Sequence, residues 1–306
     1  MGYDWDKISA DLSQIADVER EKPLAEMTSF GIGGPARIVA QPVDRDEIEA
    51  VIEYLWRNEV PFFVIGRGTN LLVADEGFDG VVVGASYDLG EIREIEEGLW
   101  RWGAGISLWR AISRAAERGF GGIEPLAGIP GSVGGAVVMN ASAYGVSFFD
   151  VVKTVELLVP QQGYVRLSSE ELAPDYRGAK IPEGALIVAA EAQLVRKEPE
   201  KIRSEITEYL SRRAKTQPVN ERSAGCVFKN PPGMHAGKLI DECGLKGYSV
   251  GGAQVSEVHA NFIINRGGAK ASDVVAIIRH IRQTVFKRFG VQLELEIKTL
   301  GFDEEI

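Results

Sequence analysis

The chain has 306 residues, with 34 Lys and Arg against 44 Asp and Glu, which gives a formal net charge of -10. Its 45% hydrophobic and 25% charged residues are typical of a globular protein and exclude a disordered chain, a collagen-like repeat and a small disulfide scaffold. The acidic balance, with a pI of about 5.0, argues against a general nucleic-acid binder, whose affinity depends on cations that neutralise phosphates.

The sequence shows no sign of export or membrane insertion. Residues 1–6 lack the basic stretch and apolar run of a secretion signal, and no stretch approaches the ~18 apolar residues of a membrane span. We therefore expect a cytoplasmic protein, without membrane association or an obligate protein partner. Cys226 and Cys243 are the only cysteines, and with three histidines they match no zinc signature, so we expect no metal. A disulfide between them is the less favoured alternative in a reducing cytosol.

The first half of the chain reads as alternating helices and strands. Residues 44–59 place apolar side chains at helical spacing and predict a helix, and 107–118 predict another behind a Ser cap. Residues 61–65 predict a buried strand that ends in a glycine turn, 66–70. Short apolar runs broken by Gly and Asp predict further strands at 71–75, 80–86, 91–97 and 99–105.

The second half begins with a glycine-dense stretch, since eight glycines fall between Gly119 and Gly145. Strands are predicted at 151–160 and 185–195, and helices at 198–214 and 272–289. Residues 291–300 alternate apolar and polar side chains, which predicts a last strand with one buried face and one face that is wet or functional. We expect the main boundary between the glycine-rich part and the rest near residue 200.

Two glycine loops, 65–71 and 127–136, suit the binding of a diphosphate. A dinucleotide-binding fingerprint is excluded because Leu71 stands where the third Gly belongs, and a P-loop is excluded because Leu239 replaces the required Ser or Thr after Lys238. What both loops offer is unhindered backbone N–H groups, which can surround phosphates. Tight turns between strands are the alternative for either loop taken alone.

Several separated motifs resemble one family, the UDP-N-acetylenolpyruvoylglucosamine reductases. They are 28–30 (TSF), 32–34 (IGG), 65–71 (IGRGTNL), 125–135 (PLAGIPGSVGG), 140–145 (NASAYG), 176–177 (YR), 224–231 (AGCVFKNP) and 296–298 (EIK). The resemblance covers about residues 25–302. It implies a mixed α/β (α+β) fold, with a two-lobed FAD-binding region of the vanillyl-alcohol-oxidase type at 1–80 and 81–198 and a C-terminal substrate-binding domain at 199–306.

The family resemblance also implies the reaction and its cofactors. NADPH reduces non-covalent FAD, and the reduced flavin reduces the enolpyruvyl double bond of UDP-N-acetylglucosamine-enolpyruvate to UDP-N-acetylmuramate for peptidoglycan. By this resemblance the two loops hold FAD, with three further residues nearby. The expected FAD-binding residues are Ile65, Gly66, Arg67, Gly68, Thr69, Asn70, Leu71, Ala127, Gly128, Gly131, Ser132, Gly134, Gly135, Asn140, Ala143 and Lys298.

Three residues are expected to be catalytic. Arg177 is a permanent cation whose planar fork suits the substrate carboxylate, and Glu296 matches the glutamate that assists at the enolate. Cys226 stands where the family more usually has Ser as the proton donor. A thiol with its ordinary pKa of ~8.5 is protonated at neutral pH, so it can serve as a general acid. A nearby cation such as Lys229 would weaken that role if it converted the thiol to thiolate.

Six residues in the C-terminal third are candidates for binding the UDP diphosphate or the carboxylate: Lys215, Lys229, Asn230, Lys238, Lys246 and His259. His259 could equally be a core histidine. Met27 and Ala179 depart from the family pattern, and the short interval between Arg177 and Cys226 resembles the family form that lacks an extra tyrosine loop. The alternatives are another non-covalent FAD oxidoreductase of the superfamily and a noncatalytic nucleotide-sugar binder.

Overall fold

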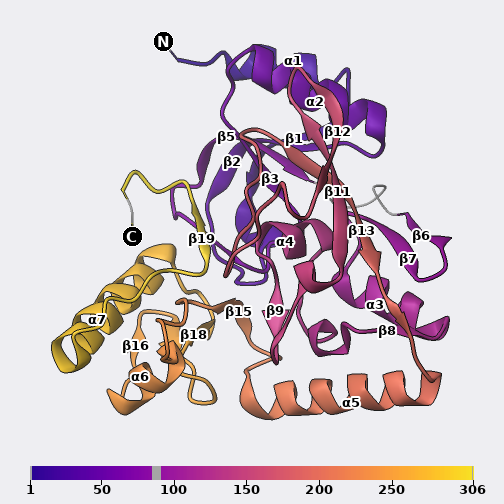
Figure 1. The fold of residues 1–306 in the computed structure, drawn as a ribbon. Coiled ribbons are helices and arrows are strands. Elements are labelled where there is room, and N and C mark those ends of the chain that lie inside the picture. The colour runs from indigo at the N-terminus through magenta and orange to yellow at the C-terminus, as the bar shows by residue number, and fades with distance from the viewer. Residues whose placement is uncertain (1, 85–90, 305) are drawn as a thin grey trace. The chain divides into compact units, whose positions relative to one another are not determined.

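The computed structural model describes residues 2–84, 91–304 and 306, and its contacts divide the chain into two compact units, which are described separately. Unit 1 comprises residues 1–20, 38–67 and 80–212, and unit 2 comprises residues 21–37, 68–79 and 213–306. Figure 1 shows mixed helices and strands in each, which confirms the α/β expectation. The division into two FAD-binding lobes, 1–80 and 81–198, and a substrate-binding domain, 199–306, stays a prediction.

The N-terminal part of unit 1 is a sheet covered by two helices. The sheet has the order β1-β2-β5-β3, and β3 is parallel to β5. Ile8 and Leu12 of α1 and Ile52 and Leu55 of α2 belong to one buried cluster with residues of β2 and β5. The bounds are α1 Trp5–Leu12, β1 Asp17–Pro23, β2 Pro35–Gln41, α2 Arg45–Arg57, β3 Phe62–Ile65 and β5 Phe78–Gly84; β1, β2 and β5 each continue into unit 2.

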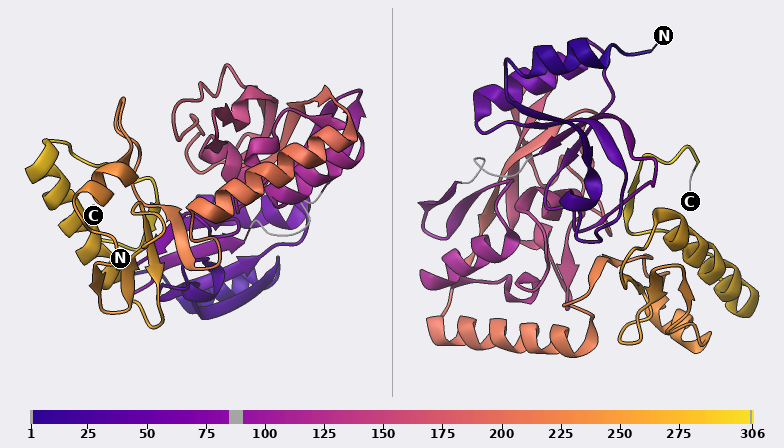
Figure 2. Two further views of the ribbon diagram at one scale, coloured as in Figure 1. Left: turned by 90° about the horizontal axis from the view of Figure 1, so that it is seen from below. Right: turned by 180° about the vertical axis from the view of Figure 1, so that it is seen from behind.

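The rest of unit 1 is built on an antiparallel sheet of order β12-β11-β13-β7-β6. One face carries Trp102, which is fully buried and stacks on Phe148. Helix α5 lies beside α3 in both views (Figure 2). The bounds are β6 Ile92–Glu96, β7 Leu99–Gly103, α3 Leu108–Glu117, β8 Phe120–Gly121, α4 Val133–Val138, β9 Ser142–Ala143, β10 Val146–Ser147, β11 Val152–Val159, β12 Gly163–Ser168, β13 Leu186–Gln193, β14 Val195–Arg196 and α5 Pro199–Thr216.

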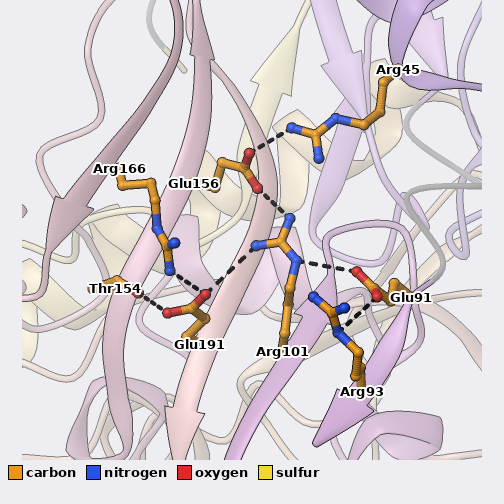
Figure 3. Close-up of polar contacts among 8 residues, drawn as sticks. All are labelled: Arg45, Glu91, Arg93, Arg101, Thr154, Glu156, Arg166 and Glu191. Atoms are coloured by element: carbon orange, nitrogen blue, oxygen red, sulfur yellow. Dashed lines mark hydrogen bonds and ion pairs between the residues drawn. The ribbon is translucent and has the colours of Figure 1, made fainter. Parts of the chain in front are cut away.

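The other face of this sheet carries a charge network (Figure 3). Arg101 on β7 bonds to Glu156 on β11 and lies 3.8 Å from Glu191 on β13, and Arg45 reaches Glu156 at 2.5 Å. Arg166 and the Thr154 hydroxyl also bond to Glu191. Partial burial raises the pKa of Glu156, but the hydrogen bonds from the two arginines outweigh this and hold the pKa below its ordinary value. Alternation along β7 therefore separates charges on one face from tryptophans on the other.

Unit 2 is a four-stranded sheet packed against two helices, with the strand order β15-β18-β17-β16. Helix α7 places Val274, Ile278, Ile281 and Val285 in its core, together with Ile240 of α6. The bounds are β4 Leu71–Val73, β15 Arg222–Cys226, α6 Ala236–Glu242, β16 Ser249–Val250, β17 Ala253–Val255, β18 Phe262–Asn265, α7 Ala271–Phe289 and β19 Lys298–Leu300, with β19 parallel to β4.

The prediction of one regular strand over 291–300 is wrong for most of its length. The regular strand is β19, Lys298–Leu300, and Leu295 makes only a single bridge, to Phe228. The alternation itself is real, because Leu293 and Ile297 are buried while Glu294 is exposed. The burial of side chains thus alternates from residue to residue, although the backbone of this segment is not continuously paired with a neighbouring strand.

Candidate functional site

The second glycine loop of unit 1 is held by backbone bonds on both sides of Ser132. Gly131 O accepts from Leu108 N at 3.0 Å, and Val133 N donates to Ile106 O at 2.9 Å. Ser132 caps α4, since its hydroxyl accepts from Gly135 N at 3.2 Å. A Cβ placed on Gly66, at the end of β3, would lie 2.6 Å from Ser132 Oγ. The first and second glycine loops therefore meet at Gly66 and Ser132.

Three backbone N–H groups in the second loop are available to a ligand. Among the residues that the structure describes, no hydrogen-bond acceptor lies in range of the N–H of Gly128, Gly131 or Ser132. Ser132 is only 4% exposed. Because a buried backbone donor is almost always satisfied, the N–H of Ser132 suits an anion such as a diphosphate, and the half-buried N–H groups of Gly128 and Gly131 lie in the same loop.

Asn140 connects the segment after the glycine loop to the turn that carries Arg177. Its Nδ2 donates to Asp175 O at 3.1 Å, and its Oδ1 accepts from Phe149 N at 3.2 Å. Arg177 Nη1 donates to Ser142 Oγ at 2.6 Å, in β9 beside Ala143. Arg177 has φ +63° and Asn140 has φ +40°, a conformation that costs a non-glycine residue energy and that clusters at functional sites. The structure therefore brings three of the predicted residues, Asn140, Ala143 and Arg177, into one cluster.

In unit 2 the remaining part of the first glycine loop is bonded to the segment that carries Glu296. Asn70 Nδ2 donates to Glu296 O at 3.3 Å, and Lys298 N donates to Asn70 O at 2.9 Å. At the other end, Ser29 N donates to Gly68 O at 3.1 Å. A Cβ on Gly68 would lie 2.1 Å from Met27 O, so only glycine fits there. The predicted residues Asn70, Glu296 and Lys298 thus belong to one hydrogen-bonded group.

Cys226 ends β15 and lies on the segment that pairs with the segment of Glu296. The strand is irregular between Ser223 and Cys226, and Gly225 has φ +82°. Immediately after Cys226, Val227 O accepts from Glu296 N at 2.8 Å. Cys226 and Cys243 form no disulfide bond. The proposed acid and the proposed carboxylate therefore come from two directly paired stretches of backbone.

Three of the four lysines expected to bind substrate have acidic partners. Lys229 lies 3.3 Å from Glu294, Lys238 lies 3.8 Å from Glu242 and Lys246 lies 2.8 Å from Asp241. Lys215 is exposed on α5. Asn230 Oδ1 accepts from Ala236 N at 3.0 Å at the start of α6. The pair with Glu294 gives the Lys229 cation a partner other than the Cys226 thiol.

His259 is half-buried and accepts a hydrogen bond. Its Nδ1 accepts from Asn261 N at 3.2 Å, which makes Nε2 the protonated nitrogen of the neutral ring. Burial lowers the pKa of His259, and the positive charge of Lys246 lowers it further. These properties fit a neutral structural histidine, and a role in substrate binding stays a prediction.

Comparisons with known proteins cover nearly the whole chain. Residues 36–168 match an FAD binding domain model, and residues 217–300 match the C-terminal domain model of UDP-N-acetylenolpyruvoylglucosamine reductase. A protein of that name from Syntrophotalea carbinolica is 41% identical over 96% of this chain and 98% of its own length. Another from Caldanaerobacter subterraneus is 44% identical over 92% of each.

The chain belongs to the UDP-N-acetylenolpyruvoylglucosamine reductase family. The crystal structure of a family member from Thermus caldophilus matches with a TM-score of 0.79 and 36% identity, over 94% of this chain and all of that one. The family relation confirms the expectations of an α/β fold and of FAD as cofactor. The unsatisfied N–H groups of the 127–136 loop fit that cofactor, because FAD contains a diphosphate.

Within the described part of the chain, no helix is long and apolar enough to cross a membrane. No cluster of three or more potential His, Cys, Asp or Glu ligands lies among residues 2–84, 91–304 and 306.

Sequence reasoning missed two polar residues that support the site. Ser29 lies in a motif that carried the resemblance, and its hydroxyl donates to Ser223 O at 2.7 Å, three residues before Cys226. Asn261 lies in the apolar run 260–264 and is 4% exposed. An uncharged polar residue inside such a run is the signal that could have identified Asn261, since buried amides need partners.

Proposed function

We propose that this chain is an NADPH-dependent FAD enzyme that reduces the enolpyruvyl double bond of UDP-N-acetylglucosamine-enolpyruvate to UDP-N-acetylmuramate. The observation that carries the proposal is the similarity to family members over nearly the full length of the chain. A cytoplasmic location belongs to the proposal, because a UDP-sugar and NADPH are the reactants. The product serves peptidoglycan synthesis.

The proposed cofactor site uses the chain's glycine loops. The N–H groups of Gly128, Gly131 and Ser132 would donate to the FAD diphosphate, and Gly66 would let the first loop approach Ser132. In this site FAD would supply the redox chemistry, which passes a hydride from NADPH to the β carbon of the enolpyruvyl group. The remaining steps fall to the side chains of this chain.

Hydride addition leaves negative charge on the α carbon and carboxylate of the substrate, and this charge requires fixed donors. The guanidinium of Arg177, held by Ser142 Oγ, would bind the carboxylate, and Glu296 would assist at the enolate. The Cys226 thiol would then give its proton to the α carbon, forming the second C–H bond and leaving a thiolate that takes a proton from solvent. Cys226 and Glu296 are supported in these roles by their paired backbone segments.

The Cys226→Ala variant tests the assignment of the proton donor. We expect it to keep NADPH-dependent flavin reduction but to lose product formation by about 10²-fold or more, the usual contribution of a general acid. The Cys226→Ser variant is the matched control and should retain substantial activity, because a hydroxyl can also donate a proton. Anaerobic flavin absorbance and product assays separate the two half-reactions. Normal turnover by Cys226→Ala would refute the role of the thiol.

The same experiment separates the alternatives. A noncatalytic nucleotide-sugar binder would neither accept electrons from NADPH nor return them to the enolpyruvyl substrate. Another oxidoreductase of the superfamily would not be reoxidised by this substrate under anaerobic conditions, whichever reductant reduces its flavin. Non-covalent FAD should leave the protein on denaturation.

A further inference from the structure

Asn261 uses both polar atoms of its carboxamide to bind Phe228, two residues after the proposed proton donor Cys226. Its Oδ1 accepts from Phe228 N at 3.0 Å, and its Nδ2 donates to Phe228 O at 2.8 Å. Both Asn261 and Phe228 are buried, at 4% and 1% exposed. Inside the core such a two-point clamp is costly to break, because the freed amide groups lose their partners without gaining water.

The backbone of Asn261 adds to this clamp. Its carbonyl accepts from Val227 N at 2.8 Å, and its own N–H donates to His259 Nδ1 at 3.2 Å. The pairing of β15 with β18 is irregular after Ser223 and ends with Cys226 opposite Phe262, so Asn261 continues the support where that ladder ends. Two consecutive residues after Cys226 are thereby bonded to Asn261.

The opposite edge of the clamped segment holds the segment of Glu296. Phe228 bridges to Leu295, Lys229 N donates to Glu294 O at 2.9 Å and Glu296 N donates to Val227 O at 2.8 Å. Residues 227–229 therefore lie between Asn261 on one side and residues 294–296 on the other. Phe228 therefore links the segment of Cys226 both to Asn261 and to the segment of Glu296.

We infer that Asn261 is a positioning residue for proton transfer, which keeps the Cys226 thiol and the Glu296 carboxyl in register through Val227 and Phe228. The inference rests on the proposed function, because it gives Asn261 its role through the proposed donor. Misplacement of reacting groups by about 1 Å can cost ~10²-fold in rate, so a residue without contact to substrate can control this step.

The Asn261→Asp variant tests the inference with a minimal change of shape. A carboxylate still accepts from Phe228 N but cannot donate to Phe228 O, and it places negative charge against that carbonyl. We expect reoxidation of the reduced flavin by the enolpyruvyl substrate to slow by about 10- to 100-fold at neutral pH. Flavin content and reduction by NADPH should remain near the wild-type values.

Acidification provides a second readout, which a general loss of structure would not produce. Burial raises the pKa of the introduced carboxyl, and its protonated form regains an O–H that can donate to Phe228 O. The rate of Asn261→Asp divided by the wild-type rate should therefore increase as the pH falls from about 8 to about 5.5. The ratio compares two proteins that share the neighbouring groups Cys226, His259 and Glu296 and the nearby charges Lys229, Glu294 and Lys246.

Asn265→Asp is the matched control, since Asn265 is a buried amide on β18 that donates to Phe30 O at 3.0 Å and makes no hydrogen bond to residues 226–228 among the described residues. It should lower the melting temperature without the selective slowing of reoxidation. A wild-type reoxidation rate in Asn261→Asp, a ratio that does not change with pH, or equal selective slowing in Asn265→Asp would overturn the inference. Failure of the wild-type protein to reoxidise with substrate would instead overturn the proposed function.

Discussion

Gly66 illustrates how a single missing side chain sets the spacing between two loops. The position that its Cβ would occupy lies 2.6 Å from Ser132 Oγ, closer than any real Cβ contact. Ser132 cannot simply rotate away, because its hydroxyl caps α4 by accepting from Gly135 N. Alanine at position 66 would therefore displace the 127–136 loop, whose N–H groups are proposed to bind the diphosphate.

We expect Gly66→Ala to weaken FAD binding by about tenfold or more, since overpacking of this kind costs ~1 to 3 kcal/mol. Gly178→Ala is a matched control, because its Cβ would meet no atom within 4 Å. The flavin absorbance per mole of purified protein, together with a titration of the apoprotein with FAD, measures the effect. Full flavin occupancy in Gly66→Ala would contradict the assignment of these loops.

For single residues, the sequence predicts which residues belong to the site better than it predicts which groups they contact. The family motifs indicate Cys226, Arg177 and Glu296, and nothing in their spacing reveals that Glu296 N bonds to Val227 O. Likewise, Lys229 is a candidate anion ligand in the sequence, whereas the structure pairs it with Glu294. Contacts between residues about 65 positions apart in the chain depend on the fold and not on local pattern.

Among the elements, α7 depends on a cap supplied from a distant part of the chain. The carboxylate of Asp75 accepts from Ala271 N at 2.7 Å, Ser272 N at 3.0 Å and Ser272 Oγ at 2.8 Å. Partial burial raises the pKa of Asp75, but these hydrogen bonds and the charge of Lys270 outweigh it and hold the pKa below its ordinary value of 3.8. The first turn of α7 is thus stabilised by a negative charge.

Asp75→Ala should lower the free energy of unfolding by about 1 to 2 kcal/mol at pH 7. Because the folded-state pKa lies below the unfolded one, the stabilisation is complete above the unfolded pKa and disappears as the pH falls through the folded pKa. The difference between the two proteins in urea denaturation should therefore shrink below about pH 4. Asp79→Ala removes an exposed ion pair with Arg37 and should cost under about 1 kcal/mol. Equal costs for both variants would contradict the capping role.

The long amphipathic elements were predictable and the glycine-rich ones were not. The helices predicted at 44–59, 107–118, 198–214 and 272–289 are confirmed as α2, α3, α5 and α7 with small changes of bounds. By contrast, α4 has glycines at 134 and 135, which disfavour a helix in isolation. Gly134 instead permits close packing, because a Cβ at this position would lie only 3.1 Å from the Cβ of Ala104.

For the molecule as a whole, binding of FAD and folding should be thermodynamically linked. The protein carries a net charge of -10, so an anionic cofactor needs local donors, and the N–H groups of residues 128, 131 and 132 are the ones proposed to bind its diphosphate. A ligand that binds only the folded state stabilises it by about 2.7 kcal/mol at 100 times its Kd. FAD should therefore raise the melting temperature of the apoprotein in a concentration-dependent way.

Riboflavin is the matched control for this prediction, because it contains the flavin ring without the diphosphate. We expect riboflavin to raise the melting temperature far less than FAD at equal concentration, as measured by calorimetry of the apoprotein. An equal rise with both ligands would show that the glycine loops do not contribute through phosphate binding.

The discontinuous make-up of unit 2 limits how the protein can be dissected. Residues 213–306 supply most of the unit, but β19 pairs with β4, α7 is capped by Asp75 and Asn265 donates to Phe30 O. A recombinant piece that starts at residue 213 would leave a strand edge, a helix end and a buried amide without their partners. Expression of this region as a separate protein therefore requires that residues 21–37 and 68–79 be joined to it. Truncation of the gene at one position does not suffice.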